Sequence, residues 1–169
     1  MSQRETAELA FECPPDFELL ELSDLSKTVS NIYAKMELLV EGESPFETYR
    51  KRAVPKPKEP LVVSKVHYGS DLTFILQAGS TILDAVQIIT SLWAFKEMAK
   101  EIGREWRKHQ VEKAFRQALT KSDKELIVAA EQVAQKYRMT LERLLQYIDP
   151  ELEMIFESRV QIKRRKGAR

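Results

Sequence analysis

The longest hydrophobic pattern in the chain lies in a proline-free stretch that follows Gly69. Apolar residues in its first part, residues 72–95, recur at spacings of three and four, the period of an α-helix. One stripe with this spacing comprises Leu72, Ile75, Leu76, Gly79, Ile82, Leu83, Val86, Ile89 and Trp93. The pattern predicts a long central helix over residues 70–121, either continuous or broken near Gly103.

The chain before this stretch predicts a small α+β unit over residues 16–69, with a flexible leader over residues 1–15 in front of it. Partial alternation predicts a short strand over residues 16–22. Alternating, β-branched residues predict a second strand over residues 61–68. Three prolines between residues 53 and 60 indicate an extended connector.

Helical spacing recurs on both sides of the central stretch. Between the two strands, a helix ending at Gly42 is predicted from Leu25, Val29, Ile32, Tyr33 and Met36. Another helix is predicted over residues 45–52 because Ser44 and Pro45 form a typical helix start. After the central helix, caps and apolar spacing predict a helical hairpin over residues 122–162, and a basic tail follows over residues 163–169.

These elements predict a mainly α-helical fold class. It consists of a small two-stranded α+β element at the N-terminal end, a long central helix and a C-terminal helical hairpin. Two strands alone are marginally stable in water, so the long helix or strands from another copy have to cover them.

Composition limits the function classes. With 169 residues, 43% hydrophobic and 31% charged, the chain can bury an ordinary core, which excludes wholesale disorder. The net charge of +1 gives no overall attraction to nucleic acid or anionic lipid, so any basic patch has to be local. Cys13 is the lone cysteine, which excludes an intrachain disulfide and indicates a reducing compartment such as the cytoplasm.

The apolar central helix predicts association with another protein. A helix that is apolar on most of its circumference is normally buried in a core, an oligomer or a bilayer. Burial of side chains such as Ile75 and Val86 contributes roughly 1.5–3 kcal/mol each. We therefore expect a non-enzymatic oligomerising or partner-binding subunit of a larger bacterial assembly. The nine residues of the stripe would form its interface, in a homo-oligomer or in a hetero-complex with another protein.

Membrane association through residues 72–95 is an alternative, because about 20 apolar residues cross a bilayer. Asp84 stands near the middle of this segment. A carboxylate at that position costs roughly 2.5–3.5 kcal/mol on insertion scales, which makes this alternative the less favoured one.

Nucleic-acid binding is a second alternative. Residues 131–147 (EQVAQKYRMTLERLLQY) resemble the helix-turn-helix segment of DNA-binding proteins, although Arg138 stands where the turn usually has glycine. A plain helical hairpin has the same spacing. The residues that would contact nucleic acid, on the second helix and in the basic tail, are Thr140, Arg143, Gln146, Lys163, Arg164, Arg165 and Lys166.

The sequence indicates no enzyme, cofactor or metal. His67 and His109 have no cysteine, histidine or carboxylate at metal-ligand spacing. Cys13 has no evident base nearby in the sequence, and the five glycines form no phosphate-binding cluster.

Residues 61–72 (LVVSKVHYGSDL), which run directly into the apolar stretch, are similar to a pattern in a group of uncharacterised bacterial proteins. In that group, a strand ending in Tyr-Gly-Ser-Pro-Leu or a similar sequence leads into a long apolar helix, after an N-terminal strand and helix. Asp71 replaces the usual proline here. The likeness extends over residues 16–110 and implies a bacterial origin and an α+β layout, but no activity and no site residues.

Overall fold

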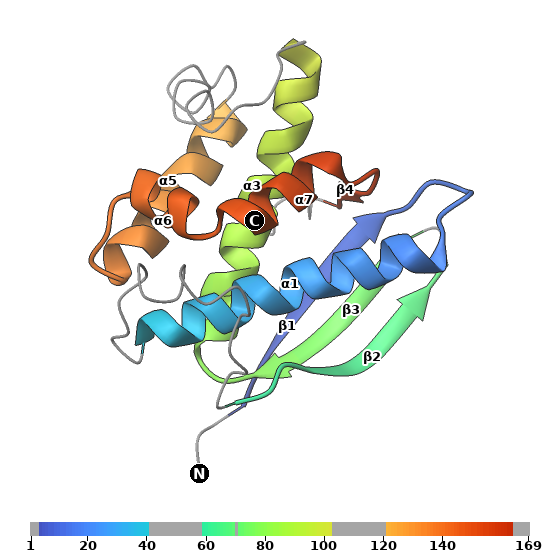
Figure 1. The fold of residues 1–169 in the computed structure, drawn as a ribbon, viewed down its shortest axis with the longest axis horizontal. Coiled ribbons are helices and arrows are strands. Elements are labelled where there is room, and N and C mark those ends of the chain that lie inside the picture. The colour runs from blue at the N-terminus through green and yellow to red at the C-terminus, as the bar shows by residue number, and fades with distance from the viewer. Residues whose placement is uncertain (1–3, 41–58, 70, 103–120, 164–169) are drawn as a thin grey trace.

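The computed structural model of the protein describes residues 4–40, 59–69, 71–102 and 121–163 (Figure 1). Several sequence predictions lie outside these residues. They are the helix over residues 45–52, most of the proline-rich connector, the second half of the central helix with its break near Gly103, His109, and the tail residues Arg164, Arg165 and Lys166.

The described helices and strands alternate along the chain. Their order is β1 (Glu5–Glu12), α1 (Leu19–Val40), β2 (Val62–Tyr68), β3 (Asp71–Ala78), α3 (Thr81–Ile102), α5 (Lys121–Lys136), α6 (Leu141–Tyr147), α7 (Asp149–Glu157) and β4 (Gln161–Ile162). The strands form one sheet in the spatial order β2-β3-β1-β4, and every neighbouring pair is antiparallel.

The two central strands have one buried face. β3 alternates strictly between buried and partly buried positions, and β1 follows a similar pattern. Because directly opposed residues of antiparallel strands point to the same side, the register places the apolar side chains of both strands on that face. These core-facing residues are Ala7, Leu9, Phe11, Leu72, Phe74, Leu76 and Ala78. The opposite face of β1 carries Thr6, Glu8 and Glu12, which are exposed.

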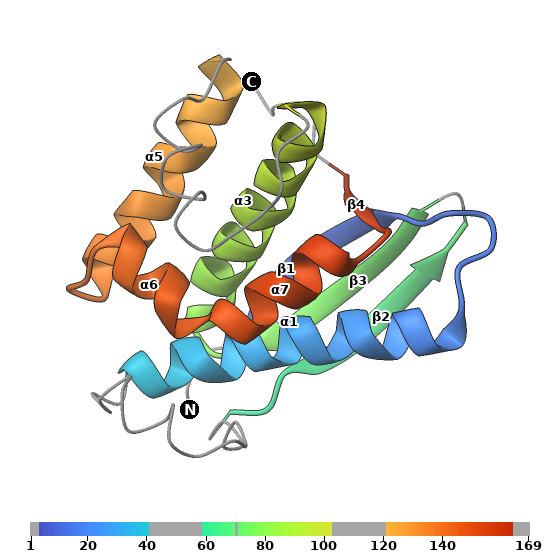
Figure 2. The ribbon, with the colours of Figure 1, turned by 45° about the horizontal axis from the view of Figure 1, so that its top comes forward.

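Helices α1 and α3 lie over the buried face of the sheet, and α5 packs against α3 farther from it (Figures 1 and 2). The Trp93 ring of α3 contacts the Phe11 ring edge to face, with centroids 5.1 Å apart. The α1 stripe that the sequence predicts is confirmed as the face of that helix that joins the core. The described helices therefore lie on one side of the sheet, and none of the described helices covers its other face.

The predicted mainly α-helical fold class is wrong, because the protein is a mixed α/β structure with a four-stranded antiparallel sheet. The expected long central helix begins with a strand, β3, and α3 starts only at Thr81 after the turn at Gly79. Leu72 and Leu76 fit the helical spacing, but together with Phe74 and Ala78 they also form a run in which every second residue is apolar, as on one face of a strand. Strand pairing with β1 on one side and β2 on the other favours the extended conformation.

Two predictions near the N-terminus are also wrong. The expected flexible leader contains β1, which lies between β3 and β4 in the sheet. The expected strand over residues 16–22 is instead a turn followed by the first residues of α1, where the Glu21 carboxylate accepts a hydrogen bond from the backbone N–H of Glu18 at 2.9 Å. A carboxylate at this end of a helix is favourable, because it satisfies a free N–H group.

The later predictions were more accurate. The strand expected over residues 61–68 corresponds to β2, and helices are present at α5, α6 and α7. The expected break between α5 and α6 coincides with Arg138, whose φ of 58° is left-handed. Thr140 caps α6 as predicted, since its hydroxyl accepts a hydrogen bond from the N–H of Arg143 at 3.2 Å. The short strand β4 was not expected.

Asp84, which the sequence presents as an obstacle to membrane insertion, joins α3 to α5. Its carboxylate accepts hydrogen bonds from the Tyr137 hydroxyl and the Lys136 ammonium, each at 2.8 Å. Burial and this neighbouring carboxylate raise the pKa of Tyr137. Within the described ranges, every helix is too short or too polar to cross a membrane.

Candidate functional site

The outer edge of the sheet is formed by β2, which has β3 as its only described neighbour. All of its residues from Val63 to Tyr68 are exposed. Three of them are large hydrophobic residues, with exposed fractions of 47% for Val63, 50% for Val66 and 74% for Tyr68. On the side away from β3, the backbone of β2 pairs with none of the described strands, and this is the side on which a further strand would pair.

The register explains why these hydrophobic side chains stand at the rim of the core. An irregularity between Val63 and Lys65 inserts Ser64, whose hydroxyl donates a hydrogen bond to the backbone carbonyl of Ile75 at 3.1 Å. After this bulge, Val66 is opposite the core residue Phe74 and Tyr68 is opposite Leu72. The side chains of Phe74 and Leu72 are buried, whereas those of Val66 and Tyr68 are largely exposed.

The other face of β2 is basic. Lys65 and His67 are two residues apart and therefore point to the same side, away from the core. Their opposite residues on β3 are Ile75 and Thr73, which carry no charge. In the part of the chain that the structure describes, neither basic side chain takes part in an ion pair or hydrogen bond. The edge therefore combines apolar side chains on one face with positive charge on the other.

The sequence-predicted interface residues do not form a surface. Six of them, Leu72, Leu76, Gly79, Ile82, Ile89 and Trp93, are buried in this chain's own interior. Ile75 and Val86 are partly buried, and Leu83 is 51% exposed. The stripe is divided between β3, the turn and α3, so a partner cannot reach most of it in this structure.

The predicted nucleic-acid contacts are only partly within the described residues. Thr140, Arg143 and Gln146 are exposed on and beside α6. The side chain of Lys163 forms an ion pair with Asp71 across the sheet. Thr140, Arg143 and Gln146 therefore lie together at one short helix. Lys163, the one tail residue that the structure describes, is paired with Asp71 on the sheet instead.

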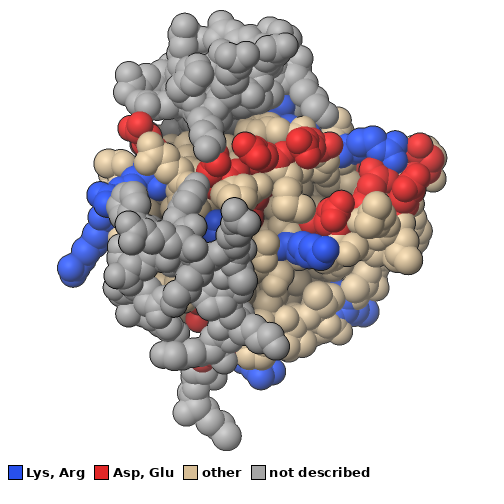
Figure 3. Space-filling view, in the orientation of Figure 1, with Lys and Arg blue, Asp and Glu red and all other residues tan. Residues whose placement is uncertain are grey.

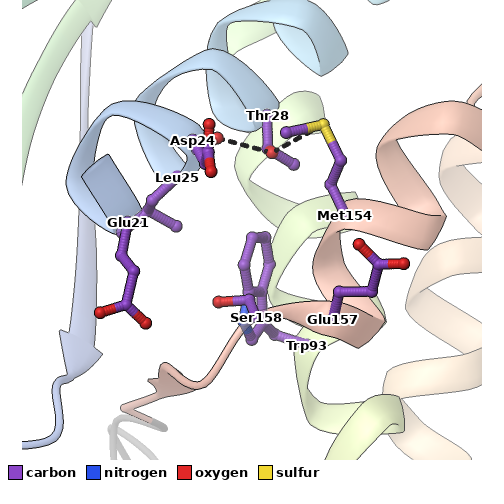
Figure 4. Close-up of a pocket in the computed structure, with 8 residues that line it drawn as sticks. All are labelled: Glu21, Asp24, Leu25, Thr28, Trp93, Met154, Glu157 and Ser158. Atoms are coloured by element: carbon purple, nitrogen blue, oxygen red, sulfur yellow. Dashed lines mark hydrogen bonds between the residues drawn. The ribbon is translucent and has the colours of Figure 1, made fainter. Parts of the chain in front are cut away.

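A pocket of about 210 Å³ lies between α1, α3 and α7 (Figure 4). The carboxylates of Glu21 and Asp24 approach it from α1, Glu157 approaches it from α7, and the Trp93 indole lies between these two walls. The Thr28 hydroxyl donates to the backbone carbonyl of Asp24 at 2.8 Å. Among the described residues, no group of three or more carboxylate, histidine or cysteine side chains is placed to hold a metal ion.

One carboxylate of this pocket is held by an arginine. Arg159 donates hydrogen bonds to both carboxylate oxygens of Glu21, at 2.7 and 2.6 Å, and to Asp16 at 3.0 and 3.1 Å. These hydrogen bonds from Arg159 lower the pKa of Glu21 to about 2. No sequence pattern pointed to this pair, because 138 residues separate its members.

The Glu21–Arg159 pair predicts a pH dependence of stability. Because folding lowers the pKa of Glu21 from 4.5 to about 2, its stabilising effect is fully present above pH 4.5 and is lost as the pH falls towards 2. We expect Glu21→Gln to have a lower urea midpoint than the wild type at pH 6, and the difference should shrink below pH 3. The matched control is Glu18→Gln, which removes a nearby exposed carboxylate that accepts no hydrogen bond from Arg159. If the urea midpoints of Glu21→Gln and the wild type differ by the same amount at every pH, the Glu21–Arg159 pair is not the source of the pH dependence.

Cys13 shows no sign of activation as a nucleophile. Burial is the largest cause that raises the pKa of its thiol, and the neighbouring Glu21 and Asp71 add to the effect. The thiol is therefore the dominant form at neutral pH, and it is the thiolate that reacts.

The sheet edge is the described feature that is best suited to contact another macromolecule, since it offers both unpaired backbone groups and exposed hydrophobic side chains. Comparisons with protein families, with curated proteins and with solved structures found no match to this chain.

Proposed function

We propose that this protein is a non-enzymatic, partner-binding subunit that receives an extended segment of another polypeptide along β2. The observation that carries the proposal is the position of β2 at the edge of the described sheet, together with the exposed side chains of Val63, Val66 and Tyr68. Addition of a strand to a sheet edge is a common mode of peptide recognition, in which backbone hydrogen bonds supply affinity and alternate side chains supply specificity.

Edge strands of soluble proteins usually carry features that prevent such pairing. These include prolines, very short strands and charged side chains that point towards the core face. β2 has seven residues, no proline and only apolar side chains at the positions facing Leu72, Phe74 and Leu76. Two other features that can oppose edge pairing, a bulge at Ser64 and the outward-facing charge of Lys65, are present in β2.

A partner strand would also shield apolar surface. Covering the exposed part of Val63, Val66 or Tyr68 contributes roughly 1 kcal/mol each, about half the value for full burial. Together with the backbone hydrogen bonds, this supports reversible binding. We place the protein in the cytoplasm, a reducing compartment that suits its lone, unpaired Cys13.

The proposal predicts that an edge substitution weakens peptide binding. A displayed library of random ten-residue segments, selected on the wild type, should yield alternating sequences. Val66→Lys should weaken their binding about tenfold or more, because it places an ammonium at the rim of the core where natural edges use lysine to block pairing. Titration of each synthetic peptide by fluorescence anisotropy gives the dissociation constants.

The control is Val128→Lys, which changes a valine of similar exposure, 49%, on α5. This variant should bind the selected peptides as the wild type does. Thermal unfolding of both variants shows whether the fold is retained. If selection yields no binder, or if the binders are indifferent to Val66→Lys, the proposed function is wrong.

A further inference from the structure

We infer that the strand received by β2 carries Asp or Glu on its outward face and belongs to a different polypeptide rather than to a second copy of this chain. This inference rests on the proposed function and adds the chemistry of the partner. It follows from the charges on β2 and from the geometry of antiparallel pairing.

The basic side chains of β2 have one side on which an opposite charge can stand directly beside them. On the β3 side, their cross-strand neighbours are Ile75 and Thr73. In the same row the next residue beyond Ile75 is Glu8 of β1, two strands away from Lys65, which corresponds to about 10 Å at ~4.8 Å per strand. A strand on the free side would place its own side chains about 5 Å from Lys65 and His67.

Figure 3 shows the side of the molecule that the helices cover, and the acidic side chains visible there lie mainly above the position of β2. Lys65 and His67 point to the opposite side of the sheet. A carboxylate-bearing strand at the edge would be attracted to the ammonium group of Lys65.

If β2 paired with the β2 of a second copy, the outward-facing side chains of one strand would stand opposite those of the other. A two-fold axis between two such strands keeps the core faces on the same side, so outward residues can only meet outward residues. A register centred on Lys65 opposes the two lysines, one centred on Val66 opposes Lys65 and His67, and one centred on His67 opposes the two histidines. None of these registers places a carboxylate opposite Lys65, and the one centred on Lys65 opposes two ammonium groups, which is destabilising.

Two defined peptides test the inference. The acidic probe is a ten-residue peptide that alternates valine with glutamate, and the basic probe alternates valine with lysine. The wild type should bind the acidic probe several-fold more tightly than the basic one, because a favourable cross-strand pair with Lys65 replaces an unfavourable one. Lys65→Glu should reverse this preference, and Lys124→Glu, an equal change of charge at an exposed position on α5, should leave it unchanged.

The outcomes separate this inference from the proposed function. Binding that Val66→Lys abolishes but that does not distinguish the two probes overturns the acidic partner and leaves edge docking intact. Loss of all edge-dependent binding overturns both. Light scattering at about 100 μM should give the mass of a monomer. A dimer that Val66→Lys dissociates would show that a second copy occupies the edge, which also overturns the inference.

Discussion

Replacing Glu151 by leucine is expected to lower the free energy of unfolding by about 3–5 kcal/mol. The Glu151 carboxylate is buried and accepts a hydrogen bond from the Lys35 ammonium at 2.7 Å, which joins α7 to α1. The same ammonium donates to the Tyr147 carbonyl at 3.0 Å and lies 5.4 Å from the centre of the Tyr147 ring. Without the Glu151 carboxylate, the Lys35 ammonium would lose the negative charge that stabilises it in the interior. Urea unfolding at neutral pH measures the loss.

A double variant separates loss of the pair from loss of packing. Lys35→Met combined with Glu151→Leu should recover most of the stability, because replacing both buried charges by apolar side chains of similar size is often neutral. Glu153→Leu, at an exposed position of the same helix, should stay within about 0.5 kcal/mol of the wild type. If the double variant is as unstable as the single one, the cost lies in packing around α7 and not in the unmatched charge.

The sequence was informative where a local signal determines the structure. Helix stripes and caps placed α1, α5, α6 and α7, and β-branched alternation placed β2. These signals operate within one or two turns of chain, so they do not depend on the rest of the fold. Arg138 illustrates the limit, since the turn forms there even though the position has no glycine. The contacts that close the turn outweigh the modest cost of a left-handed residue.

The sequence misled where two periods fit the same residues. Leu72, Ile75 and Leu76 match a helix, while Leu72, Phe74 and Leu76 match a strand. The choice depends on β1, more than sixty residues earlier, which pairs with β3 along its whole length. The alternation of Ala7, Leu9 and Phe11 was a usable signal, but those residues were assigned to the leader.

The candidate site depends on the same long-range pairing. β2 was predicted as a strand, yet its place at the edge depends on β1 and β4 occupying the other side of β3. The pocket depends on contacts between α1 and the segment after α7, which no sequence spacing reveals. A sequence pattern can therefore identify an element that binds, but only the pairing order shows which of its sides is open.

Replacing Trp93 by alanine should cost about 3–5 kcal/mol of folding free energy, since the indole is fully buried. Its ring contacts Phe11 on β1, and its N–H donates to the backbone carbonyl of Val160 at 3.3 Å, so it ties α3 to both β1 and the chain leading into β4. Truncation would remove all of these contacts and enlarge the pocket between α1 and α7. Chemical denaturation, monitored by far-ultraviolet circular dichroism, measures the effect.

This variant also decides between a core and an interface role for the apolar stripe. Leu83→Ala lies on the same helix but changes a half-exposed side chain, and it should stay within about 0.5–1 kcal/mol of the wild type. If the stripe joined two chains, as its helical spacing suggested, Trp93→Ala would lower the mass of the particle in light scattering before the protein unfolds. In the structure the indole packs on its own sheet, so the mass should stay constant while stability falls. A change of mass without loss of stability would show that the stripe forms an intermolecular contact.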